Sequence, residues 1–147
     1  DEYLLIDFGL KYQGYCSDLT RIHPLSKAVL PDIFEVVQEA QKEALSRIRP
    51  GVCSSDIDAA ARQVISRYGY GDHFGHGTGH GLGLEVHELP SLSALKPQEI
   101  QEGMTFTVEP GIYLPEFGVR SEIDAFMSET GPYATSPVQR EVVLIRG

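Results

Sequence analysis

The hydrophobic and polar positions divide the chain into β-like segments near both ends and two helical segments between them. Residues 31–49 and 54–68 carry apolar residues every three to four positions, which is the spacing of amphipathic helices. Asp56 and Asp58 lie near the start of the second segment, where acidic side chains favour the helix dipole. We therefore predict two helices that pack through their apolar faces and keep their charged faces in solvent. A final strand is predicted over residues 141–145.

A first β-hairpin is predicted before the helices. The apolar run Leu4-Leu5-Ile6 leads to Asp7, and residues 14–22 form a second β-like segment after a short polar stretch. If the chain turns near Tyr12-Gln13, Asp7 and Asp18 lie directly opposite each other, with their Cβ atoms about 5 Å apart. Two carboxylates at that distance repel unless a cation lies between them. The alternative is an offset register in which one aspartate faces solvent.

A second hairpin is predicted in the C-terminal half. Residues 104–114 form a β segment that returns over residues 119–126. A turn centred near Pro115-Glu116 would place Glu109 opposite Glu122, so a second pair of carboxylates would face each other across two strands.

Three of the five histidines lie in the glycine-rich stretch 75–88, at His76, His80 and His87. The glycines between them allow the backbone to approach a ligand closely, which we interpret as room for a bound molecule. Imidazoles that converge in this way are candidate metal ligands. The alternative is a loop whose histidines form local hydrogen bonds. The segment that follows, residues 89–97, is predicted to be a surface connection.

Composition narrows the classes of partner and compartment. A chain of 147 residues is one domain or part of one, and no apolar run reaches the length of a membrane span. The net charge of −9 argues against nucleic acid or a membrane surface as a partner. Cys16 and Cys53 are too few for a disulfide scaffold, so we read both as structural. This is consistent with a reducing compartment and predicts a cytoplasmic location.

The two acidic hairpins and the histidine stretch together supply four carboxylates and at least one imidazole. Oxygen-rich ligation with a single nitrogen suits Mn²⁺, Fe²⁺, Co²⁺ or Zn²⁺. Bridging carboxylates can hold two such ions about 3.5–4 Å apart, and a water shared between them loses a proton easily. A pair of divalent metal ions would also remove the repulsion within each hairpin.

Five motifs follow one another along nearly the whole chain: Leu5-Ile6-Asp7-Phe8-Gly9, Gly14-Tyr15-Cys16-Ser17-Asp18-Leu19-Thr20-Arg21, residues 75–88, Thr107-Val108-Glu109-Pro110-Gly111-Ile112-Tyr113 and Val119-Arg120-Ser121-Glu122. In this order they resemble the catalytic half of the pita-bread metallopeptidases, most closely the prolidase and Xaa-Pro aminopeptidase branch. The resemblance implies an α+β pita-bread (creatinase/aminopeptidase) fold, a curved antiparallel sheet with helices packed on one side. It also makes residues 1–147 the C-terminal part of a catalytic domain whose N-terminal part is missing.

The resemblance implies a metal set of Asp7, Asp18, His80, Glu109 and Glu122. By analogy Asp18 and Glu122 bridge two divalent ions, Asp7 completes one site, and His80 with Glu109 completes the other. Mn²⁺ is the expected metal, with Co²⁺ and Zn²⁺ as alternatives.

The resemblance also implies roles around the metals. His76 and His87 match substrate-side histidines that stabilise the reacting peptide, although each could instead only support the site through hydrogen bonds. Glu109 is the candidate for moving a proton during hydrolysis. Tyr113 is expected to line the substrate pocket and Arg120 to pair with a ligand carboxylate, while either could be mainly structural.

One motif departs from the family pattern. The family commonly has Arg-Ile-Glu-Asp where this chain has Arg120-Ser121-Glu122-Ile123, so the expected ligand is retained while its neighbours differ.

The function expected from the resemblance is that of an Xaa-Pro aminopeptidase, a dimetal enzyme whose peptide substrate has proline at the second position. The first alternative is an Xaa-Pro dipeptidase (prolidase). A methionine aminopeptidase, a metal-free creatinase-like enzyme and a non-enzymatic pita-bread binding module are the other candidates, and a homodimer is possible. Retention of all five expected ligands argues against the metal-free and non-enzymatic candidates.

Overall fold

The structure is a computed structural model that describes residues 3–25 and 32–141. The elements of this part of the chain, in order, are β1 (Tyr3–Phe8), β2 (Lys11–Tyr12), β3 (Tyr15–Cys16), β4 (Leu19–Pro24), α1 (Ile33–Arg47), α2 (Ser54–Arg67), the 3₁₀ helix η1 (Gly71–His73), β5 (Gly79–Gly81), β6 (Glu88–Leu92), β7 (Thr105–Val108), β8 (Gly111–Tyr113), β9 (Gly118–Arg120), β10 (Ile123–Ser128) and β11 (Gly131–Ala134). The final strand predicted over residues 141–145 lies outside the described residues except for Glu141, which is not in a strand.

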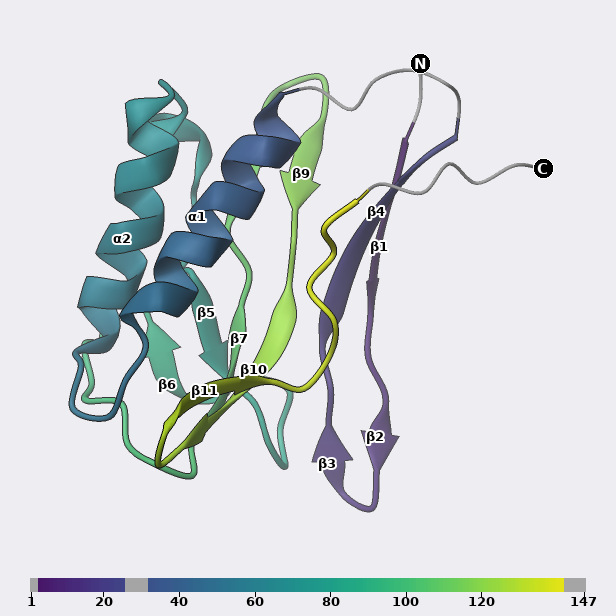
Figure 1. The fold of residues 1–147 in the computed structure, drawn as a ribbon. Helices are drawn as coiled ribbons and strands as arrows, with labels where there is room; N and C mark the ends of the chain where they lie inside the picture. Colours follow the sequence, from purple (N-terminus) through teal and green to yellow (C-terminus); the bar gives the residue numbers. More distant parts are fainter. Residues whose placement is uncertain (1–2, 26–31, 142–147) are drawn as a thin grey trace.

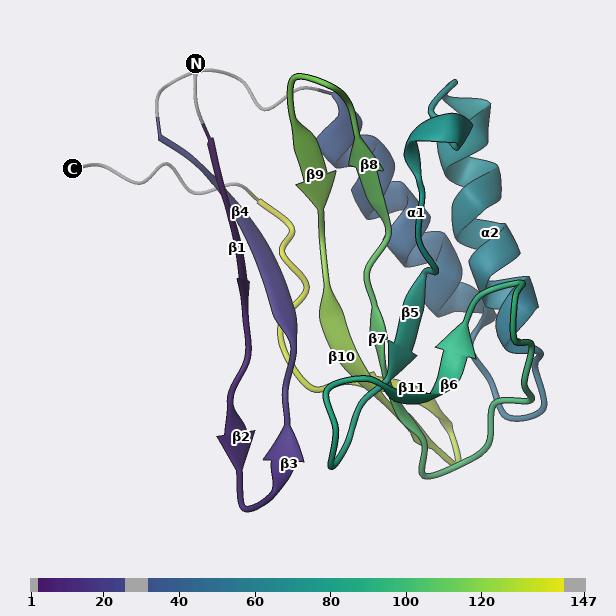
Figure 2. The same cartoon turned by 180° about the vertical axis from the view of Figure 1, so that it is seen from behind.

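An antiparallel sheet with the strand order β11-β10-β7-β5-β6 forms the centre of the molecule. The helices α1 and α2 lie side by side across one face of it, and the opposite view shows the strands uncovered (Figures 1 and 2). The predicted α+β architecture, an antiparallel sheet with helices packed on one side, is therefore confirmed. Neither helix in the described part of the chain is long and apolar enough to cross a membrane.

The helices form where the apolar spacing predicts them, because their apolar stripes pack against each other and the sheet. Val37 and Ala40 of α1 and Ile57 and Ile65 of α2 are fully buried, and each buried aliphatic side chain contributes about 1.5–3 kcal/mol. The predicted solvent exposure of Asp58 is wrong. Its side chain is only 2% exposed, because it is hydrogen-bonded to a residue of the histidine stretch.

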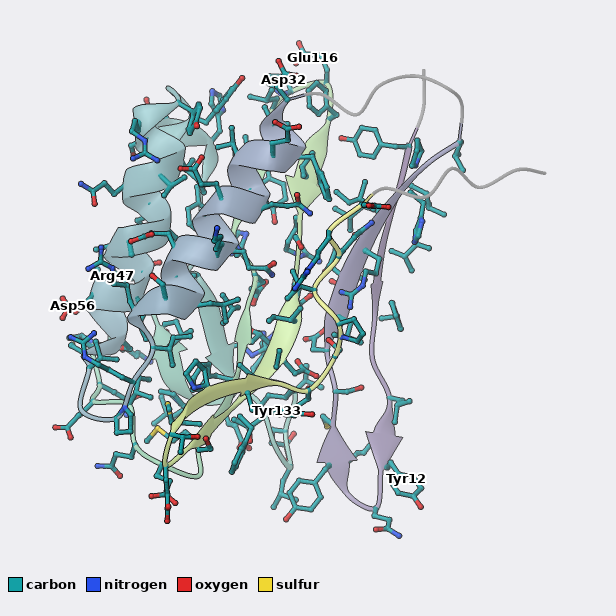
Figure 3. The ribbon with its side chains drawn as sticks, viewed as in Figure 1. Tyr12, Asp32, Arg47, Asp56, Glu116 and Tyr133 are labelled. Carbon is teal, nitrogen blue, oxygen red and sulfur yellow. The ribbon has the colours of Figure 1, made fainter. Side chains whose placement is uncertain are left out.

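The first hairpin has a different register from the predicted one. Its turn lies at Gln13-Gly14, where both residues have positive φ, as a two-residue hairpin turn requires. Asp7 is consequently opposite Thr20, and the predicted direct pairing of Asp7 with Asp18 is wrong. The hairpin continues through β2 and β3, and Figure 3 places Tyr12 at its tip.

The second hairpin has the predicted register. Gly111 pairs with Arg120 in β8 and β9, and Val108 pairs with Ile123 in β7 and β10. Glu109 and Glu122 occupy corresponding positions between these two ladders. The return segment predicted as one strand is thus two strands, separated at Ser121 and Glu122.

The glycines of the histidine stretch allow neighbouring strands to approach each other. A Cβ atom on Gly79 would lie 2.0 Å from the carbonyl oxygen of Thr107, and one on Gly81 would lie 2.2 Å from that of Leu89. These two glycines therefore allow β5 to pack closely against β7 and β6. The predicted role of the glycines, room for a bound molecule, is corrected at these two positions. The strand β6 covers Glu88–Leu92, and both Leu92 and Ser93 are buried, so the predicted surface connection begins only at Ala94.

Candidate metal centre

Three separate parts of the fold bring acidic and imidazole side chains together. The first hairpin carries Asp7 and Asp18, β5 carries His80, and the gap between the two ladders of the second hairpin carries Glu109 and Glu122. All five residues predicted as metal ligands therefore lie close together. The second hairpin has the predicted register, whereas the first hairpin has a different one.

Their ligand atoms form groups small enough to hold a metal ion. His80, Glu109 and Glu122 form one group, and Asp7, Asp18 and Glu122 form another, with the candidate ligand atoms of each group within 4.8 Å of one another. Glu122 belongs to both groups. Asp18 also approaches the first group, since its Oδ2 lies 3.8 Å from Nε2 of His80. The geometry therefore offers two adjacent groups of candidate ligands that share Glu122, and a third group of Asp18, His80 and His87 overlaps both of them.

His80 presents its Nε2 atom to the acidic cluster. The Nδ1–H group donates to the carbonyl oxygen of Gly81 at 3.0 Å, which leaves Nε2 as the nitrogen available to a metal. Nε2 lies 3.2 Å from Oε1 of Glu109. Burial would lower the pKa of His80, but the hydrogen bonds and the neighbouring carboxylates outweigh it and raise the pKa to about 9. Without metal, a proton on Nε2 therefore occupies the position that a metal would take.

Glu122 is the most enclosed carboxylate of the cluster. Its Oε2 accepts a hydrogen bond of 2.5 Å from the hydroxyl of Thr20, the residue opposite Asp7. Burial and the charge of Glu109 raise the pKa of Glu122 to about 8, although the Thr20 hydrogen bond acts against the shift. A cation beside Glu122 would favour its charged form and reverse this shift.

The carboxylate of Glu109 is held by a side chain of β7, the strand that directly precedes it. The hydroxyl of Thr107, two residues earlier, donates to Oε1 at 3.0 Å and also accepts the backbone N–H of His80. Burial would raise the pKa of Glu109, but the hydrogen bond and charge of His80 lower it overall. Oε2 of Glu109 faces Nε of Arg120 at 3.9 Å.

The two aspartates have different surroundings. The backbone N–H of Asp18 donates to Oδ2 of the buried Asp124 at 3.1 Å, and burial raises the pKa of Asp124 to about 6. Burial, followed by the charge of Asp7, also raises the pKa of Asp18. Asp7 is more exposed, and its carboxylate forms an ion pair with Arg120. Arg120 thus contacts a carboxylate of the predicted ligand set, as the sequence led us to expect.

A hydrogen-bonded chain joins Arg120 to His76. Nη1 of Arg120 donates to the Tyr113 hydroxyl at 3.3 Å, and this hydroxyl lies 2.8 Å from Nε2 of His76. The other ring nitrogen of His76 lies 2.8 Å from the carbonyl oxygen of Gly77, so Nδ1 carries the hydrogen. Nε2 then accepts the Tyr113 hydroxyl hydrogen. This chain fixes the orientation and tautomer of His76.

An open cavity of about 420 Å³ lies beside the cluster. His76, His80, His87, Glu109 and Arg120 line it on one side, and Ser91, Ser93 and Leu95 line it on another. His87 is exposed, and its ring lies tilted beside that of His80, with centroids 4.3 Å apart and an interplanar angle of 56°. A peptide in this cavity could reach both predicted substrate-side histidines and the candidate metal ligands.

Comparison with known proteins identifies the family. The model of metallopeptidase family M24 matches residues 1–129. This chain belongs to metallopeptidase family M24. A peptidase from Bacillus subtilis is 44% identical over 95% of the chain, and an Xaa-Pro dipeptidase from Pyrococcus horikoshii is 41% identical over 95%. The chain spans about 40% of the length of these relatives.

Solved structures of M24 relatives have the same fold. A prolidase from Thermococcus sibiricus superposes with a TM-score of 0.93 at 40% identity, over 97% of this chain and 40% of that one. An X-Pro aminopeptidase from Thermotoga maritima gives 0.92 at 39% identity, over 97% and 42%. An Escherichia coli aminopeptidase P variant gives 0.78 at 27% identity, over 90% and 37%. The predicted pita-bread fold is confirmed.

The donor set fits the divalent metal ions that the M24 family implies. Four carboxylates and one imidazole nitrogen meet in two overlapping groups, and burial together with the charges of neighbouring carboxylates raises the pKa of Glu122 and of Asp18. His80 already has the orientation that a metal ligand needs.

Several supporting residues were not recognised in the sequence. Thr20, Thr107 and Asp124 bond to the candidate ligands, and the helices contribute Gln41 and Asp58. The sequence positions of Thr20, Thr107 and Asp124 could have indicated this role, because each lies two residues from a predicted ligand and hence on the same strand face. That Thr20 lies opposite Asp7 follows only from the correct hairpin register.

Proposed function

We propose that the whole protein hydrolyses Xaa-Pro dipeptides with the help of two divalent metal ions. The observation that carries this proposal is the pair of ligand groups that share Glu122 beside a cavity lined by His76 and His87. The relatives support the dipeptidase alternative better than our first expectation, an Xaa-Pro aminopeptidase. Xaa-Pro dipeptidases from two Pyrococcus species are each 41% identical to the chain, whereas the aminopeptidase P of Escherichia coli is 27% identical.

The proposed metal ligands are the five predicted ones: Asp7, Asp18, His80, Glu109 and Glu122. When bound, the ions would polarise the scissile carbonyl and lower the pKa of an attacking water. Mn²⁺ is the proposed metal, because an oxygen-rich set with one nitrogen suits it, and Co²⁺ and Zn²⁺ remain alternatives.

The chain's own residues would position the peptide and move protons. Glu109 has Oε1 engaged by Thr107, so Oε2 is the atom proposed to accept a proton and return it to the departing proline nitrogen. His76, held by Tyr113, would contact the peptide beside the scissile bond. His87 would contact it from the exposed side of the cavity. Arg120 would keep Tyr113 and Asp7 in place.

The test is hydrolysis of Ala-Pro and Ala-Pro-Ala by the whole protein with Mn²⁺ added. Cleavage of the dipeptide is expected, and cleavage of the tripeptide alone would refute the dipeptidase assignment. His80→Ala is expected to remove both activity and part of the bound metal. His73→Ala is the matched control, because His73 lies on η1 beside Tyr70 and belongs to none of the candidate ligand groups. If the wild-type protein bound no metal and cleaved neither peptide, the non-enzymatic module would be favoured instead.

An Xaa-Pro aminopeptidase is the second candidate, because the Thermotoga maritima enzyme of that name superposes almost as well as the prolidase. Preference for the tripeptide would support it, and release of an N-terminal methionine would point to a methionine aminopeptidase. We also propose that residues 1–147 form the C-terminal part of a catalytic domain. A cytoplasmic location and a homodimer stay predictions.

A further inference from the structure

Gln41 is a polar residue in the apolar stripe of α1. Its side chain is only 1% exposed and reaches from the helix onto the sheet. Nε2 donates to the carbonyl oxygens of Val108 and Ser121, both at 2.9 Å. The Ser121 hydroxyl donates back to Oε1 of Gln41 at 3.3 Å.

These contacts fall directly before two predicted metal ligands. Val108 precedes Glu109 and Ser121 precedes Glu122. At this point the β7–β10 ladder ends and the β8–β9 ladder has not begun, so the two backbones leave regular pairing where the carboxylates must be placed. Gln41 joins the backbones across this gap.

Only a primary amide side chain meets all the demands of this position. Its NH₂ group has two hydrogens, one for each carbonyl, and its oxygen accepts the hydroxyl hydrogen. A carboxylate of the same shape would offer no donor to the two carbonyls. Ser121 is also the residue at which this chain departs from the common isoleucine of the family motif, and its hydroxyl completes the bonding of the buried amide.

We propose that Gln41 and Ser121 are positioning residues that set the separation of the backbones carrying Glu109 and Glu122, and thereby the affinity for metal. The proposal rests on the metal function proposed above. Neither side chain is hydrogen-bonded to a predicted metal ligand in the contacts given above. Gln41 acts through the backbone carbonyls of Val108 and Ser121, and the Ser121 hydroxyl acts through the Gln41 amide.

The test is Mn²⁺ binding by calorimetry on the metal-free whole protein, together with its thermal midpoint. Gln41→Met keeps the length and burial of the side chain but removes its hydrogen bonds to the carbonyls of Val108 and Ser121. Loss of a partner that orients metal ligands typically costs about 10- to 100-fold in metal affinity, and we expect a loss in this range. Val37→Ala is the matched control, because it removes a fully buried α1 side chain that forms no hydrogen bond to the strands.

The control separates positioning from stability. At a similar loss of thermal midpoint, Gln41→Met is expected to weaken Mn²⁺ binding and Val37→Ala is not. Equal affinities in these two variants would overturn the proposal, whereas failure of the wild-type protein to bind Mn²⁺ would overturn the proposed function itself.

Ser121→Ala gives a milder test if Gln41→Met does not fold. It leaves the two bonds to the carbonyls but frees the amide oxygen, so a smaller loss of affinity is expected. Where Gln41→Met does fold, Ser121→Ala in that background should have no further effect, because both substitutions act through one contact. Unchanged affinity in Ser121→Ala, or fully additive losses in the double variant, would refute the role of the pair.

Discussion

Replacing Asp58 by alanine should loosen the histidine stretch, although Asp58 lies on the second helix. Oδ1 of Asp58 accepts the backbone N–H of Thr78 at 3.0 Å and its hydroxyl at 2.8 Å. Oδ2 accepts Nε of Arg62 at 2.7 Å. Arg62 in turn donates to the carbonyl oxygens of Phe74 and His76. One acid–arginine pair on α2 therefore fixes the backbone on both sides of His76.

The expected loss of stability follows from burial. Thr78 is fully buried, and leaving its N–H and O–H groups without an acceptor costs about 1–3 kcal/mol each. Arg62 is 36% exposed, so its freed guanidinium regains water and adds little. The sum is a loss of about 3 kcal/mol in the free energy of unfolding for Asp58→Ala. Asp58→Asn retains an acceptor for Thr78 and weakens only the half-exposed Arg62 contact, so a loss of about 1 kcal/mol or less is expected.

Glu43 supplies a matched control. It forms an ion pair with Arg47 at the same sequence spacing and the same 2.7 Å distance, but the two side chains are 39% and 54% exposed. Arg47 lies on the outside of the helix pair (Figure 3). Glu43→Ala should therefore cost about 0.5 kcal/mol or less.

Urea unfolding of the metal-free whole protein measures both losses, and dipeptide hydrolysis measures the displacement of His76. Because small misplacements of groups at the reacting bond are costly, a roughly 10- to 100-fold lower kcat/KM is expected for Asp58→Ala. If Asp58→Ala and Glu43→Ala destabilised the protein equally, the reasoning from burial would be refuted.

Two further predictions concern protons and glycines. In the metal-free protein the pKa is about 9 for His80 and about 8 for Glu122, above their ordinary values of 6.5 and 4.5. The folded state therefore binds these protons more tightly than the unfolded state does. The free energy of unfolding of the metal-free protein should fall between about pH 4.5 and 9, while the affinity for Mn²⁺ should rise over the same range. A free energy of unfolding and an affinity that do not change with pH would contradict this. Gly79→Ala should destabilise the protein and weaken Mn²⁺ binding, because its Cβ would lie 2.0 Å from the Thr107 carbonyl oxygen. Gly75→Ala, with nothing within 4 Å of the added atom, should be nearly neutral by both measurements.

The elements and the second hairpin could be predicted because their signals are local. The apolar spacing of α1 and α2 is a property of each segment alone. Pro115-Glu116 lies at the centre of the second hairpin, so counting outward from this turn places Glu109 opposite Glu122. Turn chemistry and the alternation of strands were sufficient for this register.

The first hairpin shows how a wrong register can still lead to the right cluster. The turn lies one residue later than predicted, so Asp7 is opposite Thr20 instead of Asp18. Because strand side chains alternate with a period of two, Asp18 remains on the same face as Thr20, diagonally across from Asp7. The predicted pair of carboxylates is thus retained as a diagonal contact.

The supporting residues on the helices could not be predicted from local patterns. Asp58 and Thr78 are far apart in the sequence, and nothing near Asp58 distinguishes it from the exposed Asp56. Gln41 had a weak signal, since it interrupts the apolar stripe of α1 at a position that faces the core. A polar residue there requires a buried partner, but the sequence does not say that the partner is the backbone beside two glutamates.

Different elements of the fold hold the members of the acidic cluster in place. Arg120 pairs with Asp7, Thr107 donates to Glu109, and Thr20 donates to Glu122. Each of these contacts engages one oxygen of a carboxylate, so the other oxygen can remain available. Burial and the charge of Glu109 raise the pKa of Glu122, so gathering these carboxylates costs free energy that the packing of the hydrophobic core offsets. A bound divalent metal ion would relieve the repulsion between Glu109 and Glu122, and it would thereby stabilise the folded chain beyond the bonds it forms.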